Sequence, residues 1–405
     1  MGVASAIRCA GLALGLSIAA LGAAAAACSS GHSDEGSPDA MSQEAAADVA
    51  PDRAAAMGDV IARAVAGPMS TQGAVGMAIG AVDGDASVLA FFGEATLDGG
   101  APPNASTLFQ IGSNTKCFTA TLLAHSVSGG QTSLSDELTS DLPAAYAFPP
   151  ASEKSKITLE ELADHTSGLP RNPDDVANGA TTYSVDMLYA DGDSIAVASD
   201  AGTTFLYSNM GYALLGYALA NHAGQSWDSL VRQVITAPLG MTDTDLYAQL
   251  DAGQRARVAQ GTAPTTATCA KPPCPVPPTT LLATFPGPGL DPAGGLFSTP
   301  TDMMTWLRWN MGATDQPSLS PLLPMLRGPL VDAGTNQQVG LAWNTSTLAV
   351  GGAAQAEIWK DGDTAGFHSF VGYVASAGRG VFVLTNFQPS VTPRAIGEQI
   401  LADMP

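Results

Sequence analysis

The sequence predicts a mixed α/β (α+β) fold, with an antiparallel sheet built from both ends of the chain and a mainly helical middle. A helical pattern at 51–67 precedes two strand-like runs at 73–83 and 86–96, which the turn "DGDA" separates. A second hairpin is predicted at 367–387, and an amphipathic helix at 392–404. We therefore expect the terminal helices to cover one face of a sheet to which both hairpins belong.

The middle of the chain carries apolar residues at helical spacing. Helices are predicted at 116–130, 208–224 and 298–312, and glycines mark their ends. The last of these begins with Thr299 and Asp302 in capping-box spacing, with Pro300 in the first turn. The Pro- and Thr-rich stretch from 243 to 290 is expected to be a long surface loop.

The first 27 residues have the composition of an export signal, because Arg8 precedes an apolar stretch that ends in small residues. Cys28 follows directly, which indicates a lipoprotein cleaved before Cys28 and attached to a membrane by a lipid on that residue. Ordinary secretion of a soluble product is the alternative. Residues 28–51 are expected to form a flexible tether, and 52–405 one large domain. The protein is thus expected to be periplasmic, an outer-membrane lipoprotein, or secreted.

Composition limits the partners. The formal net charge of −21 argues against a nucleic-acid partner and against adhesion to anionic lipid heads. Cys269 and Cys274 in "CAKPPC" are a plausible small-loop disulfide in an exported chain. A metal site there would need a second pair of ligands, and none is nearby in the sequence, so no cofactor is expected. Cys117 is expected to be an inward-facing free thiol.

Ser113-Asn114-Thr115-Lys116 is the only Ser-x-x-Lys in the chain. If a helix begins near Ser113, the backbone N–H of that serine is free and Lys116 lies one turn further on, facing the hydroxyl. A serine hydroxyl needs a neighbour to take its proton, and a desolvated lysine near another cation can do so. The alternative is a capping serine with a surface lysine.

Two further stretches carry candidate site residues. Tyr207 and Asn209 lie just before a predicted helix, after a strand-like "TTFL"; the phenol could share a proton with Lys116, and the amide could hold a substrate carbonyl. Asn209 as a helix cap is the alternative. Lys360 and Gly362 are predicted to lie at the edge of a strand, where the glycine permits close approach of a ligand. A surface lysine on an edge strand is the alternative.

Taken in this order, the three stretches resemble the active-site elements of the penicillin-recognising serine hydrolases: class C β-lactamases, D-alanyl-D-alanine carboxypeptidases and related esterases. Residues 157–170, 292–307 and 363–373 also resemble that family. The resemblance implies a five-stranded antiparallel sheet flanked by helices, beside a mostly helical subdomain inserted at roughly 125–290, with the site in the cleft between them.

The resemblance also implies roles for single residues. Ser113 would be the nucleophile that forms an acyl-enzyme, and Lys116 and Tyr207 would share the acid–base work. Asn209 would bind the substrate amide, and Lys360 and Gly362 would line the opposite wall. The backbone N–H groups of Ser113 and Asp363 would hold the oxyanion. The implied substrate is a small molecule or a peptidoglycan-type peptide.

The chain departs from the family at one position of the third element. Where Thr or Ser is usual, and its hydroxyl helps to bind a substrate carboxylate, this chain has Asp361, with Asp363 close by. An ionised Asp361 would repel a carboxylate, unless it were protonated or paired with Lys360. An ester, an internal cross-link or an amide without that carboxylate therefore fits better than a penicillin or a terminal D-alanine.

Other functions have different signatures. A Ser-His-Asp hydrolase is disfavoured because G-x-S-x-G is absent, and His165 in "HTSGLP" is expected to be structural. A penicillin-binding sensor that is acylated without turnover would carry the same motifs. A catalytically silent scaffold is disfavoured by three intact elements. The sequence leaves the substrate open among cell-wall peptide, β-lactam, ester and other amide.

Overall fold

The computed structural model describes residues 17–19, 38–71, 76–97, 100–143, 156–177, 182–194, 196–263, 274–275, 287–334, 336–387 and 391–405. The predicted lipidation site at Cys28 and the predicted disulfide partner Cys269 lie outside these residues, as does most of the predicted export signal.

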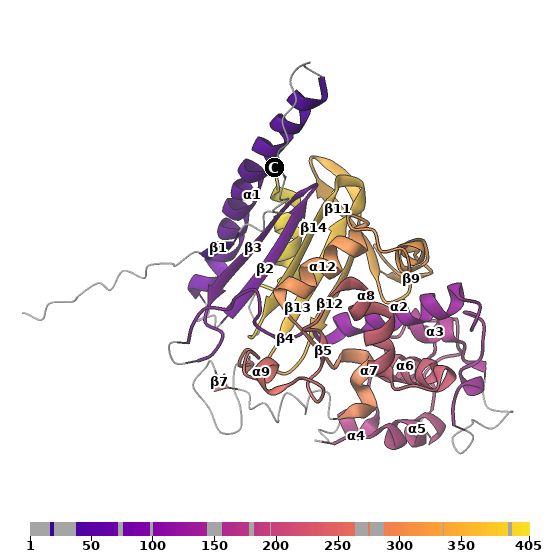
Figure 1. Ribbon diagram of the computed structural model, residues 1–405. Coiled ribbons are helices and arrows are strands. Elements are labelled where there is room, and N and C mark those ends of the chain that lie inside the picture. The colour runs from indigo at the N-terminus through magenta and orange to yellow at the C-terminus, as the bar shows by residue number, and fades with distance from the viewer. Residues whose placement is uncertain are drawn as a thin grey trace, which may run out of the picture.

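An antiparallel sheet forms the centre of the molecule (Figure 1). In the described residues it has nine strands, in the order β1-β3-β2-β14-β13-β12-β11-β10-β9. Their bounds are β1 Ser17–Ala19, β2 Gly76–Asp83, β3 Ala86–Gly93, β9 Val331–Gly334, β10 Gln337–Val339, β11 Asn344–Val350, β12 Ala353–Asp363, β13 His368–Val374 and β14 Arg379–Thr385.

The sheet is wider than the five strands expected. The two predicted hairpins and the strand around Lys360 correspond to β2, β3, β13, β14 and β12, which are neighbours in the sheet. β11 joins them through a two-residue turn at Gly351 and Gly352, whose φ values of +60° and +79° suit the tight turn that matches strand twist. β10 and β9 extend that side, and β1 pairs with β3 at the other edge.

Alternating side chains of the central strands enter two separate cores. In β2, Ala78 and Val82 join the core shared with the helical region, whereas Met77 and Ile79 join the core under the terminal helices. Every residue of β2 is buried, because helices cover both faces of the sheet. The sequence of this strand is therefore apolar on both sides instead of alternating.

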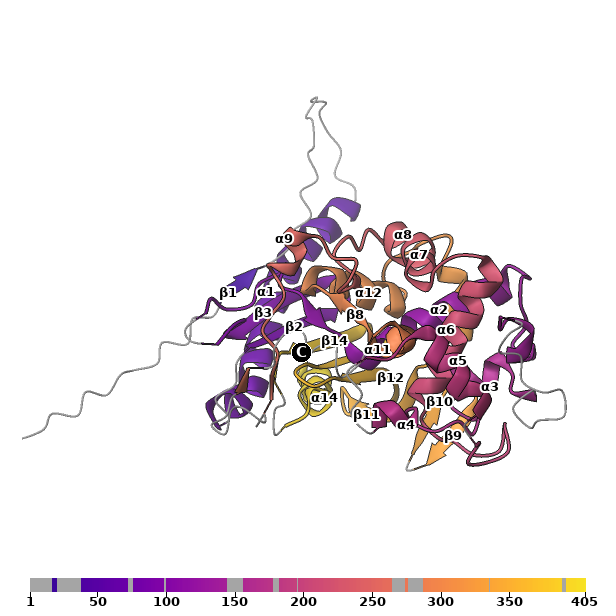
Figure 2. The same ribbon diagram turned by 90° about the horizontal axis from the view of Figure 1, so that it is seen from below.

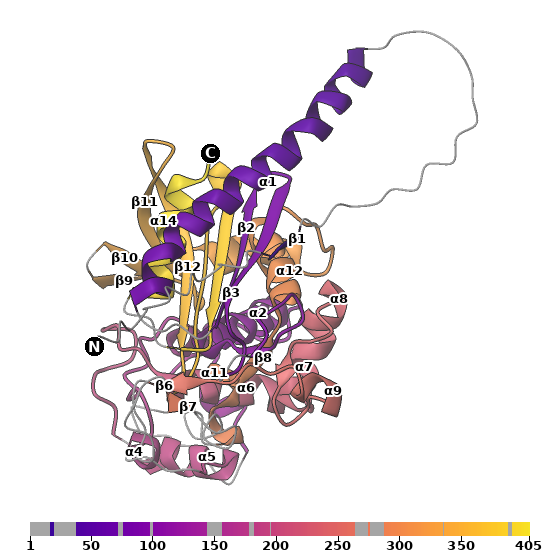
Figure 3. The same ribbon diagram turned by 90° about the vertical axis from the view of Figure 1, so that its left-hand side faces the viewer.

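Three helices cover the sheet. α1 (Pro38–Thr71) and α14 (Pro393–Asp403) contact each other on one face, and α12 (Pro300–Met311) lies on the opposite face (Figures 2 and 3). The terminal helices thus share one face, as predicted. α1 begins at Pro38, so residues 38–51, predicted as part of a tether, are helical; the run "EAAADVA" favours this because alanine has the highest helix propensity.

The helical region stands at one end of the sheet (Figure 1). Its helices are α2 Thr115–Ser128, α3 Leu159–Ala163, α4 Asp174–Ala177, α5 Val185–Ser194, α6 Asn209–Ala223, α7 Trp227–Val231, α8 Ala237–Leu239, α11 Asp291–Gly294 and α13 Leu323–Arg327. Shorter elements are β4 Phe109–Gln110, β5 Asp245–Leu246, β6 Thr262–Ala263, β7 Cys274–Pro275, β8 Leu296–Ser298 and α9 Ala252–Arg255. None of the helices in the described part of the chain is both long and apolar enough to span a membrane.

Two local predictions were wrong. The run 203–206 is turn and irregular backbone instead of a strand, since the N–H of Thr203 closes a turn onto the carbonyl of Asp200 at 3.3 Å. Thr299 does cap α12, accepting from the N–H of Asp302 at 3.2 Å. Asp302, however, accepts from Thr244 at 2.8 Å and from the N–H of Asp243, so the reciprocal half of a capping box is not formed.

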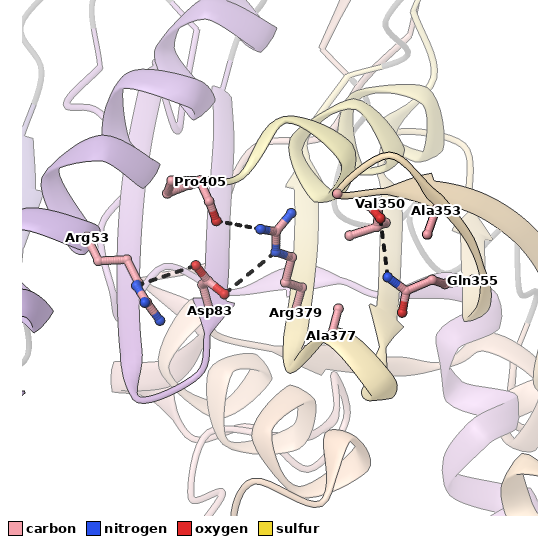
Figure 4. Close-up of a pocket in the computed structure, with 9 residues that line it drawn as sticks. Arg53, Asp83, Val350, Ala353, Gln355, Ala377, Arg379 and Pro405 are labelled. Carbon is pink, nitrogen blue, oxygen red and sulfur yellow. Dashed lines mark hydrogen bonds and ion pairs between the residues drawn. The ribbon is translucent and has the colours of Figure 1, made fainter.

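A hollow lies at the hairpin end of the sheet, where the turns between β2 and β3 and between β11 and β12 lie, away from the helical region (Figure 4). It is lined by Arg53, Asp83, Arg379 and Pro405, among others. Asp83 is buried between Arg53 and Arg379, with N···O distances of 3.7 and 3.6 Å. Arg379 also donates to the backbone oxygen of Pro405. The buried anion at this end is therefore neutralised by cations on both sides.

Candidate active site

Ser113 lies in a 3₁₀ turn, Gly112–Asn114, directly before α2. Gly112 has φ +52°, a conformation that favours glycine. The turn is fastened to β13 because Asn114 Nδ2 donates to Ser369 Oγ at 2.8 Å, and that hydroxyl donates to the carbonyl of Ile111 at 2.7 Å. The serine is thereby held at a fixed position against the sheet.

Gly362 allows the strand β12 to lie against this turn. A Cβ at Gly362 would come within 2.2 Å of the carbonyl oxygen of Ile111 and 2.9 Å of the backbone nitrogen of Ser113. The close approach expected here is therefore to the protein's own backbone. A Cβ at Gly112 would lie 2.9 Å from the backbone nitrogen of Asp363, so the two nitrogens expected to hold an oxyanion border the same small space.

Lys116 is fully buried, and its ammonium has three acceptors. Nζ lies 3.2 Å from Ser113 Oγ, 2.8 Å from Asn209 Oδ1 and 2.6 Å from the carbonyl oxygen of Ala293. Three acceptors match the three N–H groups of an ammonium. Burial, reinforced by the charge of Lys360, lowers the pKa of Lys116 to about 8, although Tyr207 opposes the shift. The surface-lysine alternative is wrong.

Three cationic side chains lie close to the ring of Tyr207. Its hydroxyl is 2.7 Å from Ser113 Oγ, and Lys116 Nζ, Lys360 Nζ and Arg171 Cζ lie 5.0, 4.9 and 5.0 Å from its ring centroid. Burial by itself would raise the pKa of Tyr207, but the charges of Lys116 and Lys360 outweigh it and lower the pKa. The phenol and the amine therefore both have lowered pKa values and can exchange a proton with each other.

His165 fixes the segment that carries Tyr207. Its Nδ1 accepts from the backbone N–H of Ser208 at 3.1 Å, and its ring centroid lies 4.3 Å from that of Tyr207. Burial lowers the pKa of His165 well below its ordinary value, so the ring is neutral. Among the described hydrogen bonds, Ser113 Oγ is contacted by Lys116 and Tyr207 and by no histidine. This geometry fits the structural role expected for His165.

Asn209 is free to serve the site because Ser208 caps α6 in its place. Ser208 Oγ accepts from the N–H of Gly211 at 2.8 Å, so the helix-cap alternative for Asn209 is wrong. Asn209 Oδ1 accepts from Lys116, and Nδ2 donates to Asn172 Oδ1 at 2.7 Å. The amide has a second N–H, which can be offered to a substrate carbonyl.

Ser113, Tyr207 and Asn209 line one cleft, with a volume of about 400 Å³, whereas Lys116, His165 and Gly362 do not line it. It is lined by the predicted Ser113, Tyr207, Asn209, Lys360, Asp361 and Asp363, and by Arg171, Phe205, Gln337, Asn344, Trp359 and Arg394. Sequence reasoning missed the second group. Arg171 directly follows the "HTSGLP" segment, which was a usable signal, whereas Arg394 comes from the first turn of α14 and had none.

The two aspartates of β12 differ. Asp363 is exposed and pairs with His368, whose Nδ1 lies 2.5 Å from Asp363 Oδ1; this hydrogen bond lowers the pKa of Asp363. Asp361 is half-buried, and among the described residues none forms a hydrogen bond with its carboxylate or an ion pair within 4 Å. No ion pair joins Asp361 to Lys360 among the described residues, although the charge of Asp361 contributes to raising the pKa of Lys360. The described residues also contain no cluster of His, Cys, Asp and Glu suited to a metal ion.

Both the sequence and the fold of this chain are similar to those of known proteins. A family model described as Beta-lactamase matches residues 61–403. The chain is 28% identical over 331 residues to the D-alanyl-D-alanine-carboxypeptidase/endopeptidase AmpH of Escherichia coli (strain K12), a match that covers 78% of this chain and 80% of the relative. It is 26% identical over 361 residues to a beta-lactamase of Pseudomonas fluorescens, covering 78% and 90%. The crystal structure of D-alanine carboxypeptidase AmpC from Burkholderia cenocepacia superposes with a TM-score of 0.71 at 27% identity, covering 85% of this chain and 98% of that one.

Proposed function

The chain belongs to the beta-lactamase family of serine hydrolases, and from this premise we propose that it hydrolyses an amide or ester through an acyl-enzyme on Ser113. The substrate class comprises cell-wall D-alanyl peptides, β-lactams and small esters.

One observation carries the proposal: Ser113 Oγ has both a buried amine and a phenol as neighbours. Lys116 Nζ is at 3.2 Å and the Tyr207 hydroxyl at 2.7 Å, both within reach for proton transfer. A serine in a cap or on a surface has no need of two such groups. The lowered pKa values of Lys116 and Tyr207 supply a proton acceptor that is available close to pH 8.

In the acylation step, Ser113 Oγ forms a bond to the substrate carbonyl carbon while its proton passes to the Lys116–Tyr207 pair. The carbonyl oxygen gains negative charge and is held by the backbone N–H groups of Ser113 and Asp363, a contribution of roughly 10²–10³ in rate per donor. The bond between the carbonyl carbon and the leaving nitrogen or oxygen then breaks, and the leaving atom takes the proton from Tyr207. Hydrolysis of the acyl-enzyme uses the same groups, with a water molecule in place of the leaving group.

The cleft suits an extended substrate. β11 pairs with β12 only as far as Trp359, and no described strand pairs with β12 on that side from Lys360 to Asp363. An extended chain can hydrogen-bond to such an edge while Asn209 binds its amide from the other wall. The carboxypeptidase and endopeptidase activities in the name of the Escherichia coli relative, and the name of the Pseudomonas beta-lactamase, support the same substrate class.

We propose further that the protein is exported, either secreted or held in the periplasm or outer membrane by a lipid on Cys28. The support is the charged start, the apolar stretch and the small residues before Cys28. Metabolic labelling with a fatty acid, for wild type and Cys28→Ala, tests the lipid: label on both proteins, or on neither, contradicts it.

The test of function incubates the protein with a fluorescent penicillin and a chromogenic ester, for wild type and Ser113→Ala. We expect an adduct or product that depends on Ser113. Adduct without turnover would identify a penicillin-binding sensor in place of an enzyme. Absence of any Ser113-dependent adduct or product would contradict the proposal, provided that the circular dichroism and melting temperature of the variant match wild type.

A further inference from the structure

Asp361 occupies a position where two hollows meet. It lines the catalytic cleft and also an adjoining hollow of about 360 Å³, bounded by His368, Thr392 and Arg394, and Arg394 likewise lines both. Side chains alternate along β12, so Lys360 is directed toward the helical region and Asp361 toward the α14 side. A substrate that reaches beyond Ser113 along β12 therefore passes the Asp361 carboxylate.

The neighbouring charges at this junction already have partners. Asp363 is paired with His368 at 2.5 Å. Arg394 is paired with Glu398 at 2.6 Å, and its guanidinium lies 3.5 Å from the ring centroid of Trp359. The carboxylate of Asp361 has no such partner among the described residues, so this half-buried anion is the group left to meet a ligand.

The other cations of the cleft are engaged elsewhere. Lys360 Nζ lies over the ring of Tyr207, and Arg171 lies over the same ring from the wall that carries Asn209. The backbone carbonyl of Arg171 accepts from the N–H of Asn209, which fixes it to that wall. Among the described residues, the charge on the wall beyond Ser113 that lacks an ion-pair partner is the negative charge of Asp361.

We infer that Asp361 is a specificity-determining residue, which selects substrates whose leaving group carries a positive charge, such as a protonated amine, in place of a carboxylate. The inference rests on the proposed acyl-enzyme function. An unpaired carboxylate attracts a cation and repels an anion, and the half-buried position reduces screening of both effects by water.

The experiment uses three thioesters that share a phenylacetylglycyl acyl group. Their leaving thiols are thiocholine, 3,3-dimethylbutanethiol and 3-mercaptopropanoate, which are cationic, neutral and anionic; the first two are nearly identical in shape. Release of thiol is followed with a chromogenic thiol reagent. We expect kcat/KM for the thiocholine ester to exceed that for its neutral isostere by about tenfold at low ionic strength, and to fall toward it as salt is added.

The variants separate Asp361 from general charge effects. Asp361→Asn and Asp361→Thr should abolish the cation preference, and the threonine variant should gain about tenfold on the anionic thioester. Asp403→Asn removes one exposed carboxylate at the far end of α14 and should leave all three rates unchanged. Arg394→Gln tests the nearby cation.

The outcomes are distinguishable. Loss of all three hydrolyses in Ser113→Ala is required by the proposed function, and hydrolysis that survives in Ser113→Ala contradicts that function. If hydrolysis depends on Ser113 but shows no cation preference, or a preference that survives in Asp361→Asn, only the present inference is overturned. Preference for the anionic thioester that disappears in Arg394→Gln would likewise overturn it.

Discussion

The buried charges at one end of the sheet form ion pairs, whereas the buried lysines at the other end do not. At the hairpin end, Asp83 is held between Arg53 and Arg379, so each charge has a partner of opposite sign (Figure 4). At the cleft end, Lys116 and Lys360 are both buried within about 5 Å of one phenol, and neither forms an ion pair among the described residues.

The difference separates a structural role from a chemical one. Charges that are compensated locally keep a fixed protonation state and hold elements together, whereas crowded like charges shift pKa values. At the cleft end the cost of burying Lys116 appears as a pKa lowered to about 8. Substitutions at the two ends should therefore affect different properties.

The largest expected effect is that of Lys116→Met on acylation. Removing the amine takes away the proton acceptor next to Ser113, so kcat/KM should fall by about 10³-fold or more. Steady-state kinetics with a chromogenic ester measure it, and Lys156→Met on the protein surface is the matched control. A loss below tenfold would show that Tyr207 suffices as the base.

Lys360→Met should separate activity from stability at the cleft end. Without this charge the pKa of Tyr207 rises, and we expect kcat/KM near neutral pH to fall by about 10²-fold. The free energy of unfolding should stay within about 1 kcal/mol of wild type, because the desolvation cost of this buried lysine is offset by the attraction of Tyr207 and Asp361, which raises its pKa. Denaturant unfolding that shows a loss above about 2 kcal/mol would contradict the comparison.

Asp83→Asn should do the reverse at the hairpin end. It leaves the mostly buried Arg379 without its anion, and we expect the free energy of unfolding to fall by about 1–3 kcal/mol, less than for a fully buried pair because Arg53 is 43% exposed. Activity per folded molecule should not change. A matching loss of kcat/KM at a temperature where the variant is folded would refute the separation of the two ends.

The smallest expected effect concerns pH. Because protonated Lys116 cannot take the proton of Ser113, kcat/KM should fall as the pH drops through about 8. The charge of Arg171 lowers the pKa of Lys116, so Arg171→Gln should move this limb of the profile to higher pH, by about half a unit. Arg308→Gln in α12 is the control, because Arg308 neither lines the cleft nor contributes to the lowered pKa of Lys116. A shift to lower pH, or none, would exclude Arg171 from the proton-transfer network.

Much of the fold could be predicted because its signals are local. Four of the five central strands (β2, β3, β13 and β14) are apolar runs bounded by turn residues, and Gly129 and Gly224 mark helix ends as expected. The turn at Gly351-Gly352 was an equally local hairpin signal, and reading it would have added β11. β9 and β10 could not be found in this way, because their short, partly exposed runs have little apolar periodicity.

The site residues can be divided in the same way, into those with a local sequence signal and those without one. Ser113, Lys116, Tyr207 and Lys360 belong to recognisable short stretches, and the structure brings all four together, with Lys116 buried beneath the cleft that the other three line. Arg394 arrives only through the packing of α14 against the sheet, which no short stretch of sequence records. The role of Ser208 as the cap of α6 was also hidden, because both Ser208 and Asn209 are good capping residues.

β11 pairs with only part of β12, and this has a consequence for how a ligand is recognised. Because the ladder stops at Trp359, the amide and carbonyl groups of the next few residues of β12 have no described strand beside them on that side. A bound peptide would complete the sheet for as long as it stays, and its release would undo those same bonds. Turnover would then be limited for long, well-paired peptides and faster for short ones that touch fewer of these groups.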